Sequence, residues 1–84
     1  MKKESMKITG YKKADTELEG CMVMSDIGIA ASADTLRALA AFLLSAAEQM
    51  EELGSDYDHI HLMDEWSGWQ DGLPDIQVLS EKYI

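Results

Sequence analysis

Hydrophobic and polar residues alternate in four short stretches of the chain, and a period of two residues is typical of β-strands. Residues 6–11 show the pattern most simply, with Met6 and Ile8 on one side and polar side chains between them. The same alternation recurs in three later stretches. A bend or bulge is expected at Gly20 and Gly28 in the first of the three, residues 18–30. These stretches are residues 18–30, 58–63 and 76–79.

A period of three to four residues marks the segment 33–53 instead, and this spacing predicts an amphipathic helix. The segment is rich in Ala, Leu, Glu and Met, which favour helix. Ser32 is placed to cap its first turn, and Gly54 is placed to end it. We expect its apolar stripe to be buried; this stripe consists of Leu36, Leu39, Phe42, Leu43, Leu44, Ala46, Met50 and Leu53.

The order of these elements, β-β-α-β-β, predicts an α+β fold. We expect one domain over residues 1–84, with residues 1–5 flexible. The expected architecture is a four-stranded, mainly antiparallel sheet with one long helix packed on one face. Because one helix cannot cover both faces, the second face must meet solvent, another copy of the chain, or a partner.

Charge is distributed very unevenly along the chain. The net charge is −9, yet residues 1–13 hold five Lys and one Glu. From Glu48 to Asp75 there are nine acidic residues and no Lys or Arg. Such a surface repels itself unless it meets a positively charged partner. Nucleic acid and anionic membranes are poor candidates because both require a basic face, so we expect a basic protein as the partner.

The sequence contains no apolar segment typical of a signal peptide or of a membrane span, so the expected compartment is the cytoplasm. Cys21 is the single cysteine, which excludes a disulfide within the chain. It stands among Met22, Val23 and Met24, where a buried, unreactive thiol is expected.

Candidate residues for chemistry are few. His59 and His61 are two residues apart on a predicted strand, so both imidazoles share one side, and Asp64, Glu65 or Cys21 could complete a metal site. The spacings typical of established zinc motifs are absent. A nucleophilic pair of Cys21 with a histidine would need an accessible thiol. We therefore expect neither catalysis nor a cofactor.

Trp66 and Trp69 stand in the acidic segment, in a stretch predicted to be a loop. Either ring can fold back onto the rim of a small core, or it can act as an aromatic anchor in an interface. The expected partner-binding region combines these rings with nearby acids and imidazoles. It comprises Asp58, His59, His61, Asp64, Glu65, Trp66, Trp69 and Asp71, with Glu51 and Glu52 at its rim.

Several features in a fixed order resemble a known family over residues 6–79. They are Met-Lys-Ile-x-Gly-Tyr at 6–11, Ala-Ser-Ala-Asp-Thr-Leu-Arg-Ala-Leu-Ala-Ala-Phe-Leu-Leu at 31–44, Ala47-Glu48-Gln49-Met50, His59-x-His61 followed by an acid and Trp66, and Pro74-Asp75-Ile76-x-Val78. This arrangement is similar to family thirty-two of the bacterial polymorphic-toxin immunity proteins. The acidic loop with two tryptophans is longer than the family pattern.

The resemblance implies a small cytoplasmic protein that binds a cognate toxin and neutralises it, without enzymatic activity. Two other functions stay open at this point. One is a small metal-binding protein that uses His59 and His61. The other is a homodimer that buries the open face of the sheet and has no toxin partner.

Overall fold

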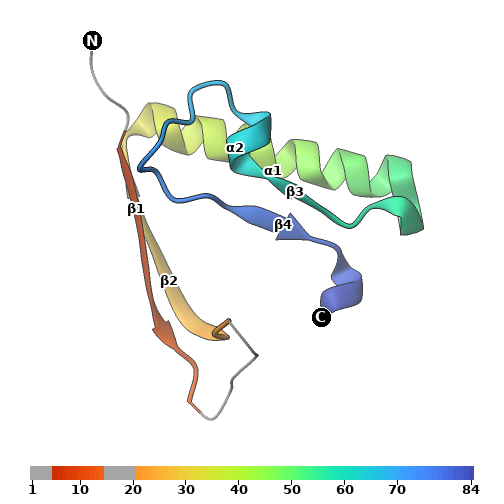
Figure 1. Cartoon of the computed structure of the whole chain (residues 1–84), viewed down its shortest axis with the longest axis horizontal. Helices are drawn as coiled ribbons and strands as arrows, with labels where there is room; N and C mark the ends of the chain where they lie inside the picture. Colours follow the sequence, from red (N-terminus) through yellow and green to blue (C-terminus); the bar gives the residue numbers. More distant parts are fainter. Residues whose placement is uncertain (1–4, 15–20) are drawn as a thin grey trace.

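The structure is a computed structural model that describes residues 5–14 and 21–84. The expectation for residues 1–4 and the first part of the strand predicted over 18–30 lie outside the described residues. The described elements follow the predicted order, with a short second helix and two 3₁₀ turns added (Figure 1). They are β1 (Met6–Lys12), β2 (Met24–Ala31), α1 (Ala33–Leu53), η1 (Gly54–Asp56), β3 (His59–His61), α2 (Leu62–Glu65), β4 (Gln77–Leu79) and η2 (Glu81–Tyr83).

β1 and β2 form an antiparallel hairpin, called here the hairpin arm, which points away from the rest of the molecule (Figure 1). Ile8 lies opposite Ile29, and Thr9 lies opposite Gly28. Residues directly opposite each other share one face of a sheet, so the alternation predicted from the sequence is confirmed here. Cys21 precedes β2 on this arm and is exposed, so its expected burial was wrong.

The long helix α1 has the bounds that its sequence predicts. The Ser32 hydroxyl accepts a hydrogen bond from the Thr35 amide at 3.1 Å, and Gly54 ends the helix with a φ of 57°, a conformation that favours glycine. The buried face is narrower than expected. Its buried residues are Thr35, Leu39, Phe42 and Ala46, whereas Leu36, Leu43, Leu44 and Leu53 are exposed.

The predicted four-stranded sheet was wrong, because the strands form two separate two-stranded antiparallel sheets. β3 pairs with β4 over three residues each, and the backbone bond from Leu62 N to Ile76 O at 2.8 Å extends this pairing. Leu62 then begins α2, which ends the strand earlier than the predicted residue 63. The edge of this β3–β4 sheet is so short that it offers little backbone for the hairpin arm to pair with. The sheet also covers only part of α1.

The core lies where α1 faces β3, β4, the segment between α2 and β4, and the base of the hairpin arm. Its buried members are Met6, Leu39, Phe42 and Leu62. Tyr57 is also buried, and its hydroxyl donates to the Val78 carbonyl at 2.7 Å. Within the described residues, no helix is long and apolar enough to cross a bilayer.

Candidate functional site

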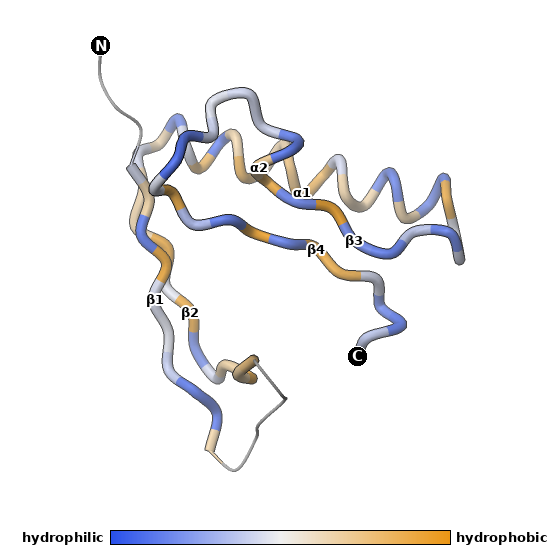
Figure 2. The backbone as a smooth tube through the Cα atoms, viewed as in Figure 1, coloured by the Kyte–Doolittle hydropathy of each residue, from blue (hydrophilic) through white to orange (hydrophobic). Residues whose placement is uncertain are grey.

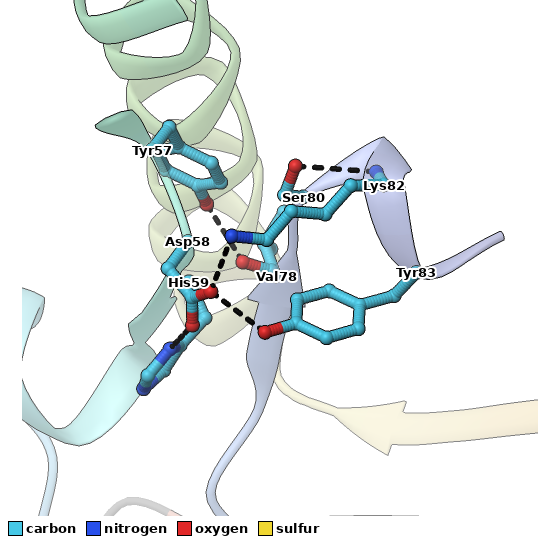
Figure 3. A network of polar contacts seen from close by, with 7 residues as sticks. All are labelled: Tyr57, Asp58, His59, Val78, Ser80, Lys82 and Tyr83. Carbon is cyan, nitrogen blue, oxygen red and sulfur yellow. Dashed lines mark hydrogen bonds and ion pairs between the residues drawn. The ribbon is translucent and has the colours of Figure 1, made fainter. Parts of the chain in front are cut away.

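The first cluster of the candidate site surrounds Asp58, immediately before β3 (Figure 3). Its Oδ1 accepts a hydrogen bond from the Tyr83 hydroxyl at 2.7 Å and pairs with Lys82 Nζ at 2.8 Å. Its Oδ2 accepts a hydrogen bond from His59 Nδ1 at 2.6 Å. The Ser80 amide also donates to the Asp58 carbonyl at 2.7 Å. These contacts fasten η2 to the start of β3.

The electrostatics of this cluster follow from its hydrogen bonds. Bonds from Lys82, Tyr83 and His59 hold the pKa of the Asp58 carboxyl well below its usual range. The same contact with Asp58 raises the pKa values of Lys82 and Tyr83. Asp58 is therefore ionised, and its charge is already matched by Lys82, so a partner would have to compete for it.

A second carboxylate, Asp75, lies at the other end of the β3–β4 sheet. Its Oδ2 accepts a hydrogen bond from His61 Nδ1 at 2.6 Å, and its Oδ1 accepts one from the Met63 amide in the first turn of α2 at 2.9 Å. Burial pushes the pKa of Asp75 upward, but the bonds from His61 and the Met63 amide outweigh this effect and lower the pKa. Through these hydrogen bonds Asp75 orients the His61 imidazole and holds the first turn of α2.

The two imidazoles expected to share one side are adjacent, with ring centroids 5.0 Å apart in an edge-to-face arrangement. Each Nδ1 is held by a carboxylate, Asp58 for His59 and Asp75 for His61. An ionised carboxylate can only accept, so both Nδ1 atoms act as donors. In the described part of the chain, no group of three or more His, Cys, Asp or Glu side chains is placed to hold a metal ion.

Both tryptophans pack against the core and are partly buried. Trp69 donates its indole N–H to the Pro74 carbonyl at 3.1 Å. The Trp66 ring lies against Gly68, where an added Cβ would come within 2.7 Å of the ring. Each ring therefore completes the core rim, one of the two roles weighed from the sequence. Trp66 and Glu65 line the same hollow beside α1.

The exposed acids of the candidate site fall into two groups. Asp64 and Glu65 lie on α2, with Asp71 in the loop that follows. Glu51 and Glu52 lie at the end of α1, whereas α2 packs near its middle (Figure 1). Within the described residues, none of these five forms a salt bridge. The structure therefore does not place Glu51 and Glu52 beside α2.

Asp75, Lys82 and Tyr83 complete the two clusters but were not among the residues predicted from the sequence. Asp75 belongs to the Pro74-Asp75-Ile76 pattern noted in the sequence, but no local pattern connects it with Met63, twelve residues earlier. Lys82 and Tyr83 are distant from Asp58 in the sequence, and no local pattern connects them. The sequence alone therefore gave no basis for expecting Asp58 to be paired.

The fold and the clusters define a small α+β protein whose carboxylates, imidazoles and indoles surround one short sheet. The chain belongs to the family described as Immunity protein 32, whose family model matches residues 26–81, more than half of the chain. The resemblance found in the sequence is thereby confirmed. Comparisons with curated proteins and with solved structures give no match to the chain.

Proposed function

We propose that this chain is an immunity protein that binds a cognate toxin domain in the cytoplasm of the producing cell and neutralises it. Membership of the Immunity protein 32 family is the observation that carries this proposal. The chain acts by binding, with no catalytic step of its own. The toxin is expected to be basic where it is bound, because the chain carries a net charge of −9.

The proposed contact surface, called here the acidic face, consists of Asp64, Glu65 and Asp71. All three are exposed and have no basic neighbour in the described structure, so a basic partner gains their full attraction. We expect the exposed parts of Trp66, which lines a hollow with Glu65, and of Trp69 to supply apolar contact. Asp58 is less available than the sequence suggests, because Lys82 already pairs with it.

The other candidate residues take subsidiary places in this proposal. His59 and His61 keep their Nδ1 atoms bound to Asp58 and Asp75, so only their remaining ring atoms are open to a partner. Glu51 and Glu52 form a second acidic group that only a large partner reaches at the same time. If the toxin acts on nucleic acid, the carboxylates of the acidic face can occupy the surface of the toxin that otherwise binds phosphates.

The function is tested by capturing partners from the source cell's lysate on the immobilised chain and identifying the retained protein. That protein is then expressed in a test host with and without this chain. We expect growth to stop when the captured protein is expressed alone and to resume when both are present. A captured protein that is harmless, or whose toxicity this chain does not relieve, would refute the proposal.

The acidic face is tested with a charge-reversal pair and a control of equal net charge. We expect Asp64→Lys with Glu65→Lys to slow association with the captured toxin about tenfold or more and to weaken its dependence on salt, because long-range attraction steers encounter. Asp26→Lys with Glu81→Lys changes the net charge equally at exposed positions elsewhere. Stopped-flow or surface binding measurements give the rates.

Equal slowing by both double variants would mean that net charge alone matters and that the acidic face has no special role. If neither double variant changes the rate, the toxin binds elsewhere on the chain. The growth assay would still separate that outcome from a failure of the immunity function itself.

A further inference from the structure

The hairpin arm has one face that is apolar from Met6 to Gly10 and over the residues opposite them. Pairs of opposite residues place these side chains together: Met6 with Ala31, Ile8 with Ile29 and Gly10 with Ile27. The first of them belongs to the core, and exposure then increases along the arm, from 8 % for Met6 to 45 % for Ile29 and 62 % for Ile27. The hydrophobic face of the core thus continues outward into solvent.

This face continues into a groove at the corner between the arm and α1. The groove has a volume of about 120 Å³ and an entirely apolar lining, formed by Ile29, Leu39, Phe42, Leu43 and Ile76. Leu36 is one helical repeat of seven residues from Leu43, shares its side of α1 and is also exposed. We call the exposed part of this surface the apolar elbow; it consists of Ile27, Ile29, Leu36 and Leu43.

An uncovered apolar elbow is unfavourable for a small domain. A two-stranded hairpin is only marginally stable alone in water, and this arm packs against the body mainly at its base (Figures 1 and 2). Contiguous exposed apolar surface of this kind marks an interface. This surface belongs to the chain itself, so a cover would stabilise the fold whether or not a toxin is present.

We propose that a second copy of this chain covers the apolar elbow, with the arm of each copy packed against α1 of the other around a two-fold axis. Each copy carries both a projecting apolar arm and an apolar groove, so one surface can complement itself, as a two-fold interface requires. No other molecule is guaranteed to be present each time the chain folds.

Charge allows the same occupant at this surface, although the two chains repel each other elsewhere. Residues 32–84 contain eleven acids and two bases, a net charge of −9, whereas residues 1–31 contain five of each and are neutral. The apolar elbow itself contains no charged residue. Two acidic chains can approach closely only where their acids are absent, and a basic toxin has no electrostatic reason to prefer this surface.

The dimer leaves the acidic face free. Ala41 borders the hollow beside Glu65 and Trp66, whereas Leu43 lines the groove of the apolar elbow. Two residues apart on a helix of 3.6 residues per turn, Ala41 and Leu43 point about 160° apart. The hollow beside Glu65 and the groove of the apolar elbow therefore lie on opposite flanks of Phe42, which borders both. The dimer proposed here does not depend on the proposed function.

Sedimentation equilibrium over a range of chain concentrations tests the proposal. We expect the wild-type chain to have twice its single-chain mass of 9.3 kDa. Ile27→Glu should raise the dissociation constant of the dimer about tenfold or more, because it places a charge in a buried contact. Ala30→Glu is the control, since it puts the same side chain on the same strand but on the opposite face.

A second pair of variants tests the helix side of the surface. Leu43 and Leu44 are adjacent and exposed by 54 % and 67 %, but only Leu43 lines the groove. Leu43→Glu should dissociate the dimer and Leu44→Glu should not, with circular dichroism confirming that both fold. A wild-type chain that stays monomeric at every concentration overturns the proposal. A dimer that neither Ile27→Glu nor Leu43→Glu dissociates also overturns it. So does a hairpin arm whose amides are protected from hydrogen exchange only when toxin is bound.

Discussion

At the scale of single residues, the carboxylates of this protein differ more in their neighbours than in their chemistry. Asp58 and Asp75 each accept two or more hydrogen bonds, whereas Asp64 and Glu65 face solvent without a basic neighbour in the described structure. The first pair holds the fold together, and the second pair is available for binding. The sequence shows an acidic segment but does not distinguish these two uses.

The Asp58 cluster predicts a pH-dependent contribution to stability. Because hydrogen bonds hold the folded-state pKa of Asp58 below its ordinary value of 3.8, its contribution is complete above that value and is lost as pH falls toward the folded-state pKa. We expect Asp58→Asn to destabilise the chain at neutral pH, with the difference from wild type shrinking as pH falls below about 4. Urea unfolding at a series of pH values measures this.

The control for Asp58 is Asp56→Asn, which removes an exposed acid that has no salt bridge in the described structure. This variant should unfold at nearly the same urea concentration as wild type at neutral pH. If Asp58→Asn behaves like its control, the contacts with Lys82 and Tyr83 add nothing to stability.

The two tryptophans predict different responses to a matched substitution. Trp69→Phe removes the indole N–H that donates to the Pro74 carbonyl, whereas Trp66→Phe removes an indole for which the described structure shows no hydrogen bond. We expect Trp69→Phe to lower the free energy of unfolding by about 1 kcal/mol more than Trp66→Phe does. Chemical denaturation of the two variants side by side gives this difference, and equal losses would contradict it.

At the scale of elements, local sequence patterns predicted the bounds of the long helix and the approximate positions of the strands, because neighbouring residues determine these. The bounds of α1 follow from Ser32, Gly54 and the helix formers between them, and the sequence predicted all of these. The positions of β1 and β4 were also predicted closely. Strand pairing is not a local property, because a period of two tells which side chains share a face but not which edges meet. The single four-stranded sheet was wrong for this reason.

The capping of α1 predicts a measurable effect. Ser32→Ala removes the hydroxyl that accepts from the Thr35 amide, so we expect the free energy of unfolding to fall by about 1 kcal/mol. Ser55→Ala is the control, because Ser55 is exposed in η1 and caps no helix. Thermal or urea unfolding followed by circular dichroism compares them. A Ser32 variant as stable as its control would mean that water replaces the cap.

At the scale of the whole molecule, the net charge of −9 and the extended arm set the main physical constraints. The sequence predicted the acidic surface and the family. It did not reveal the apolar elbow, because Leu36, Leu43, Ile27 and Ile29 show the same spacing as core residues. These side chains are exposed because the hairpin arm projects from the rest of the molecule. The arm projects because β1–β2 and β3–β4 form two separate sheets.

Self-repulsion predicts that salt stabilises the folded chain. Raising the salt concentration from about 0.01 M to about 0.15 M shortens the screening length from about 30 Å to about 8 Å, so the repulsion between acids weakens. We expect the urea midpoint of the wild type to rise over this range. The Asp26→Lys with Glu81→Lys variant, whose net charge is −5 because each reversal adds two, should respond less. Equal responses would point to an ion-specific effect.

The hydrogen bonds that Asp75 makes to His61 and Met63, together with the Leu62–Ile76 backbone bond, close the segment between α2 and β4 at its base. Residues 70–72, at the exposed part of this segment, are thereby insulated from the ladder that fixes β3 to β4. Gln70 and Asp71 can be exchanged while the scaffold below keeps its geometry, whereas Gly72 has a φ of 97°, which favours glycine. The β3–β4 sheet with α1 and α2 is thus a suitable scaffold for randomised loops, from which binders of new specificity can be selected.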